Sequence, residues 1–149
     1  MRVDFRAQRQ QPRAMGAWGH RAFDNDTAND WAYDLREADD LSLVESALAE
    51  LEGVGDEYLD QDVACNALAA CEVLARLRGN HGYENSYTKK VDEWVKAHPL
   101  MPPSSLLARA AAAIDRILGD DSELRELWDE TGDTDWHDGV RELRQRVGS

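Results

Sequence analysis

Apolar side chains recur every three or four positions along most of this 149-residue chain, and this spacing constrains the fold more than any other feature. It is the interval at which an α-helix returns to the same face. Convincing alternation of apolar and polar residues is absent, and β-branched residues are sparse. We therefore expect an all-α fold: a single compact bundle of six or seven short helices over residues 15–147, opened by an N-terminal loop rich in tryptophan and glycine.

Residues that favour helix ends set the expected boundaries. Asp, Asn and Ser favour N-caps, whereas Gly and Pro stop helices. Asp120 with Glu123 three positions later resembles a capping box. The expected helices run from Asp24 or Asn25 to Ala38, from Asp39 or Asp40 to Gly53, from Asp60 or Gln61 to Gly79, from Thr88 to Ala97, from Ser104 or Ser105 to Gly119, from Leu124 to Asp129, and from Asp133 or Thr134 to Val147.

The block 15–31, MGAWGHRAFDNDTANDW, is the most distinctive part of the chain. Trp18 stands between Gly16 and Gly19, residues that allow unusual backbone angles or a close approach. We interpret Trp18 as a plug at one end of the bundle, with a ligand-stacking platform as the alternative. The five tryptophans should be largely buried: Trp18, Trp31, Trp94, Trp128 and Trp136.

Three aspartates in this block are the sharpest polar candidates. Asp26 and Asp30 are four positions apart and so are neighbours on one helix face, with Asp24 just before them. Together they could bind a divalent cation such as Mg²⁺ or Ca²⁺. The alternative is that they cap free N–H groups and complement the helix dipole. We expect no other cofactor.

A second polar cluster gathers around Trp128 and Trp136. His137 lies there among carboxylates and could ligate a metal or act as a general base. A solvated corner between two helices is the alternative, because no HExxH-type spacing is present. The acidic members of this cluster are Asp129, Glu130, Asp133, Asp135 and Asp138.

The charge balance excludes several classes of partner. The chain has 17 basic and 30 acidic residues, a formal net charge of −13. Eleven acidic residues and no Lys or Arg fall between Glu37 and Ala75. Such a surface repels phosphate backbones and anionic membranes. We therefore expect neither nucleic acid nor membrane as a partner. A basic protein partner, a cation, or simply the solubility of an acidic surface remain as interpretations.

The cysteines and the first residues bear on the compartment. Cys65 and Cys71 are six positions apart in one expected helix, about 9 Å along its axis and beyond the ~7 Å reach of a disulfide. We interpret both cysteines as buried free thiols of a protein in the reducing cytoplasm. Residues 1–14 hold four Arg and no hydrophobic stretch, so we interpret them as a disordered basic extension or a start-site artefact rather than a signal peptide.

From Met15 onward the chain resembles a family of small, mostly bacterial proteins known as domain of unknown function 4259. Its members begin with MGAWG, followed by a phenylalanine, an Asn-Asp pair and a tryptophan. The resemblance continues loosely through ARLRG and SELRELWDETG. The resemblance implies a helical domain with its native start at Met15, and it implies no particular activity. The matching residues are Gly16, Ala17, Trp18, Gly19, Phe23, Asn25, Asp26, Asp30 and Trp31.

These observations favour a protein-interaction or regulatory module with a basic partner. Nucleophile elbows, P-loops and dinucleotide fingerprints are absent from the sequence. The alternative is a divalent-metal-dependent enzyme or small-ligand binder that uses the N-terminal aspartates. In that case His137 or Asp138 would join them in space, since the ends of a bundle often lie close together.

Overall fold

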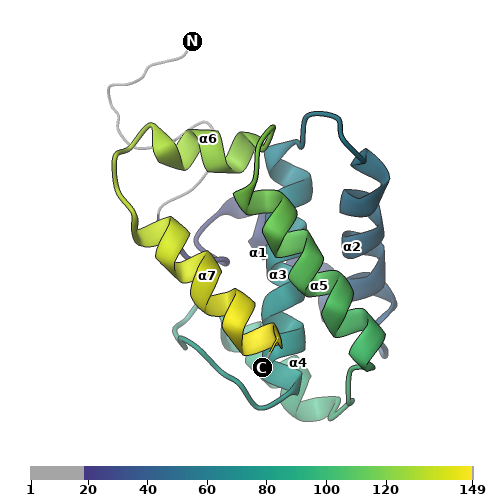
Figure 1. The fold of residues 1–149 in the computed structure, drawn as a ribbon. Coiled ribbons are helices and arrows are strands. Elements are labelled where there is room, and N and C mark those ends of the chain that lie inside the picture. Colours follow the sequence, from purple (N-terminus) through teal and green to yellow (C-terminus); the bar gives the residue numbers. More distant parts are fainter. Residues whose placement is uncertain (1–18, 149) are drawn as a thin grey trace.

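The computed structural model describes residues 19–148, which form seven α-helices joined by short loops (Figure 1). This confirms the all-α expectation. An isolated β-bridge joins Leu59 and Ser122 within that range. The predicted basic extension, the start at Met15 and the Trp18 plug lie outside the described residues. The helices are α1 (Asp26–Leu35), α2 (Ser42–Val54), α3 (Gln61–Leu77), α4 (Lys89–Ala97), α5 (Ser104–Leu118), α6 (Glu123–Asp129) and α7 (Asp135–Gly148).

Helix α3 is the centre of the fold. In Figure 1 it runs behind α5, with α2 on one side and α7 on the other. It contacts each of the other six helices. Twelve of its 17 residues are buried, many of them alanine, and such small side chains let neighbouring helices approach closely. Across the described residues, no helix combines the length and apolar character that crossing a membrane requires.

The tryptophans anchor the packing around α3. Trp31, Trp94, Trp128 and Trp136 are each at most 8% exposed, which confirms the prediction for these four. The Trp94 indole N–H donates to the carbonyl of Ala38 at 2.9 Å. The indole nitrogen of Trp31, by contrast, is buried without a hydrogen-bond partner. Its contribution to stability is therefore packing alone.

Two of the predicted N-caps are confirmed. The Asn25 side chain accepts from the Ala28 N–H at 2.8 Å at the start of α1. Asp60 accepts from the Asp62 N–H at 2.9 Å at the start of α3. Both satisfy N–H groups that have no partner within the helix.

Two other capping predictions are wrong. Ser104 lies inside the first turn of α5 and makes no capping bond. The capping box at Asp120 does not form, because the residue before α6 is Ser122. The Leu59–Ser122 bridge brings the start of α6 beside the start of α3. The Glu123 carboxylate therefore accepts from the N–H of Gln61, at 3.0 Å, and caps α3 instead of its own helix.

The last turn of α7 is held by side chains from the end of α3. Arg78 donates to the carbonyl of Val147 at 2.6 Å. Asn80 donates to the carbonyl of Arg146 at 2.9 Å. These bonds satisfy carbonyls that a helix leaves open at its C-terminus. They also fix Arg146 close to α3.

Candidate functional site

A pocket of about 380 Å³ opens where the loop before α1 meets α3, α6 and α7. Its volume falls in the range of small-molecule sites, about 300–1,000 Å³. The walls are mostly apolar and include two tryptophan side chains. Polar groups enter from Glu72, His20, Tyr83 and Arg146. The apolar lining comes from Leu68, Leu124, Trp128, Trp136, Val140 and Leu143.

One side of the pocket holds a buried ion pair. Glu72 on α3 is 3% exposed, and its two oxygens accept from the guanidinium of Arg146 at 3.1 and 3.0 Å. Arg146 also donates to Glu142 at 2.7 Å. Burial lowers the pKa of Arg146, but its bonds to Glu72 and Glu142 raise that pKa further than burial lowers it. The guanidinium therefore stays charged, and the pair is bidentate.

A second arginine extends this pair into a network. Arg76, one helical turn after Glu72, is fully buried and lies 3.4 Å from it. Its guanidinium also lies 3.3 Å from Asp92 on α4 and donates to the carbonyl of Tyr83 at 2.7 Å. Arg76 thus connects the pocket to the loop before α4. Glu72 and Arg76, four positions apart, interrupt the otherwise apolar run 67–77 of α3, and this is the signal in the sequence that could have indicated a buried ion pair.

Tyr83 and His20 also contribute polar groups to the lining. The Tyr83 hydroxyl accepts from the Phe23 N–H at 3.1 Å, and burial raises the pKa of this phenol, so it stays protonated and can donate. The Nδ1 atom of His20 is buried without a hydrogen-bond partner. A buried polar atom of this kind is uncommon in folded proteins. It gives the pocket a free polar group for a ligand.

The N-terminal aspartates do not gather. Asp24 is buried and accepts from the Arg21 N–H at 3.2 Å, in the turn before α1. Asp26 and Asp30 are exposed on α1. Among the described residues, the carboxylates of these three aspartates do not form a group of metal-ligating atoms within 4.8 Å of one another. A metal at these three residues stays a prediction.

His137 pairs with an acidic residue of the predicted cluster. Its Nε2 lies 2.7 Å from an oxygen of Asp129, and its ring packs edge-on against Trp136. Trp136 lines the pocket, whereas His137 is not among the lining residues. The structure does not join His137 to the N-terminal aspartates. His20 lies nearer the pocket, because the loop before α1 runs past Gly139 of α7.

Two acidic segments, 56–62 and 120–126, meet at one end of the bundle. The Leu59 N–H donates to the Asp121 carbonyl at 2.8 Å, and the Tyr58 hydroxyl donates to Glu126 at 2.7 Å. This bond raises the pKa of Tyr58 to about 12. We call the carboxylates gathered here the acidic end. Its members are Asp56, Glu57, Asp60, Asp62, Asp120, Asp121, Glu123 and Glu126.

Comparison with known proteins places the chain in a family. The model of the family described as "Domain of unknown function (DUF4259)" matches residues 16–139. No curated protein and no solved structure is significantly similar to the chain. The family match spans the loop before α1, helices α1 to α6 and the start of α7, and the pocket-lining residues Val140, Glu142, Leu143 and Arg146 lie beyond it. Since it covers well over half of the sequence, the chain belongs to the DUF4259 family.

Proposed function

We propose that this protein is an interaction module that binds a basic protein partner through its acidic end. The observation that carries the proposal is the meeting of segments 56–62 and 120–126, which are remote in sequence. Most carboxylates there are exposed to solvent. A concentrated field of one sign steers an oppositely charged partner and raises its association rate.

The two arginines near the acidic end, Arg116 and Arg125, offset only part of the charge of its eight carboxylates. The guanidinium of Arg116 is engaged with the backbone carbonyls of Glu57 and Asp120. Arg125 is shared between Asp120 and Asp129. Both arginines therefore hold the loops together, while the surplus of negative charge stays available to a partner.

The test is a pull-down from host lysate with a charge-matched control. At 0.1 M salt the Debye length is about 10 Å, and at 1 M about 3 Å, so an electrostatic partner is retained only at low salt. Neutralising the acidic end should release that partner, whereas neutralising three acids elsewhere should not. The acidic-end variant is Asp56→Asn with Glu57→Gln and Asp121→Asn. The control is Asp34→Asn with Glu93→Gln and Asp138→Asn.

Two results would contradict the proposal. One is the absence of any specific partner at low salt. The other is equal loss of the partner in both triple variants, which would mean that total charge, and not the acidic end, determines binding. Added DNA should not bind to the acidic end in place of the partner, because we expect no nucleic-acid binding by so acidic a surface. The buried, free Cys65 and Cys71 support our further proposal of a reducing, cytoplasmic location.

A second candidate function is small-ligand binding in the pocket. The unpartnered Nδ1 of His20, together with two tryptophan walls, favours it. A fluorescent anilinonaphthalene sulfonate dye can probe the pocket. Gly139→Leu on α7 would direct a side chain toward His20 and should reduce dye binding. Gly53→Leu on α2, where an added Cβ has open space, should leave it unchanged. Equal dye binding in both variants would place the dye elsewhere.

A further inference from the structure

We propose that His81, Glu84 and Asp92 form a binding site for one Zn²⁺ ion. The site lies beside the pocket, where the loop before α4 folds back against that helix. His81 and Glu84 come from the loop, and Asp92 comes from the first turn of α4. It is separate from the acidic end and from the N-terminal aspartates.

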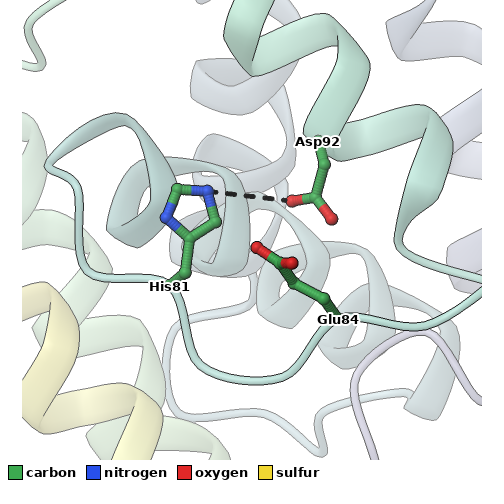
Figure 2. Close-up of side chains that lie close together, drawn as sticks. All are labelled: His81, Glu84 and Asp92. Carbon is green, nitrogen blue, oxygen red and sulfur yellow. Dashed lines mark ion pairs between the residues drawn. The ribbon is translucent and has the colours of Figure 1, made fainter.

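The three side chains converge on one point. Figure 2 shows the imidazole of His81 and the carboxylates of Glu84 and Asp92 directed toward one another. One ligand atom from each lies within 4.8 Å of the others, and Nε2 of His81 is 4.0 Å from Oδ1 of Asp92. That distance is too long for a hydrogen bond. Tetrahedral zinc places neighbouring ligand atoms about 3.3–3.5 Å apart, so a small contraction of an exposed loop would close the site.

Asp92 is held in place for such a role. Its Oδ2 accepts from the hydroxyl of Thr88 at 2.9 Å, and Thr88 is fully buried. The Thr88 hydroxyl accepts in turn from the Asn85 N–H at 3.0 Å. Hydrogen bonds to a ligating carboxylate are what orients metal ligands in known sites. One oxygen of Asp92 is thus fixed, and the other faces His81.

That other oxygen, Oδ1 of Asp92, is buried and has no hydrogen-bond partner. Its nearest cationic group is Arg76, at 3.3 Å, and this charge opposes a metal ion. Glu72 lies 3.4 Å from Arg76 and offsets it. The carboxylates of Glu84 and Asp92 therefore remain to neutralise a divalent cation. Arg76 also donates to the carbonyl of Tyr83, which anchors the loop between the two loop ligands.

The donor set indicates the metal. One imidazole nitrogen and two carboxylate oxygens suit Zn²⁺, whereas Mg²⁺ and Ca²⁺ prefer oxygen donors alone. Three protein ligands leave a fourth position for water, as in zinc sites that are open to substrate. His81 and Glu84 are exposed, so an ion can enter from solvent.

Calorimetric titration of the full chain with zinc sulfate tests the proposal. We expect one equivalent of Zn²⁺ to bind, and His81→Ala or Glu84→Gln to weaken binding by at least about 100-fold, since changes to supporting residues alone cost 10–100-fold. Glu93→Gln and His137→Gln are the matched controls and should bind as the parent does. With Co²⁺ in place of zinc, the intense visible absorption of a four-coordinate ion should appear and depend on His81. Circular dichroism confirms that each variant is folded.

Three outcomes would overturn the proposal. The first is no zinc binding by the parent chain. The second is binding that both His81→Ala and Glu84→Gln leave unchanged. The third is an equal response to Mg²⁺ that Asp26→Asn removes, which would place the cation at the N-terminal aspartates.

Discussion

Replacing Glu72 by glutamine should strongly destabilise this protein, although the two side chains have nearly the same shape. Glu72 is 3% exposed and faces two guanidinium groups: that of Arg146 at 3.0 Å, whose side chain is 11% exposed, and that of the fully buried Arg76 at 3.4 Å. A neutral amide would leave part of this positive charge uncompensated. Removing one partner of a buried ion pair costs about 3–5 kcal/mol. The same change at Glu142, the exposed partner of Arg146, should cost at most about 1 kcal/mol.

Urea denaturation followed by tryptophan fluorescence measures this difference, because four tryptophans are buried in the native state. With a denaturant slope of about 2 kcal/mol per M, a loss of 3–5 kcal/mol lowers the midpoint by roughly 1.5–2.5 M. The slope itself should not change. If Glu72→Gln costs less than about 1 kcal/mol, or no more than Glu142→Gln, then Glu72 does not compensate the positive charges of Arg146 and Arg76 as we propose.

Four other predictions follow from the structure. Trp31→Ala should lower the free energy of unfolding by about 3–5 kcal/mol in the same assay, and a loss below about 1 kcal/mol would contradict its core position. Glu123→Ala should cost about 1 kcal/mol by uncapping α3, and it should be detected as faster amide exchange at Gln61 rather than in α6. Burial raises the pKa of Cys65 to about 12, and the pKa of Cys71 also rises, so a thiol reagent at pH 8 should label neither until urea is added. Because the native thiols keep their protons while unfolded thiols lose them, stability should also fall as the pH rises from about 9 toward 12, measured by the shift of the urea midpoint.

The helices could be predicted because their signals are local. Asn25 and Asp60 cap the helices that follow them, as expected, and the apolar stripe of α3 gives its position directly. The predictions of some helix ends are less accurate. The second helix continues past Gly53 to Val54, and Gly55, where φ is +62°, is its C-cap. A glycine in a helix costs only about 1 kcal/mol, and tertiary packing can supply that. It is the positive φ, not the residue type, that ends the helix.

The candidate site could be predicted only in outline. The sequence places glycines, aromatics and acids near both ends, and the pocket does join Gly19 to Trp136 and Gly139. Its charged residues were missed, because the partner of Glu72 lies in the last helix and no local pattern connects them. The convergence of His81 and Glu84 with Asp92 could not be predicted either, because it depends on how Arg76 anchors the loop.

The ion pair between Glu72 and Arg146 also sets the order of events during synthesis. These residues are 74 positions apart. At about 5–20 residues per second, a ribosome needs roughly 4–15 s to travel from one to the other. Throughout that interval the central helix carries an acidic side chain whose main partner has not yet been made, so burying it is unfavourable. The nascent chain should therefore stay open until Arg146 has left the ribosomal tunnel, and only then close around α3.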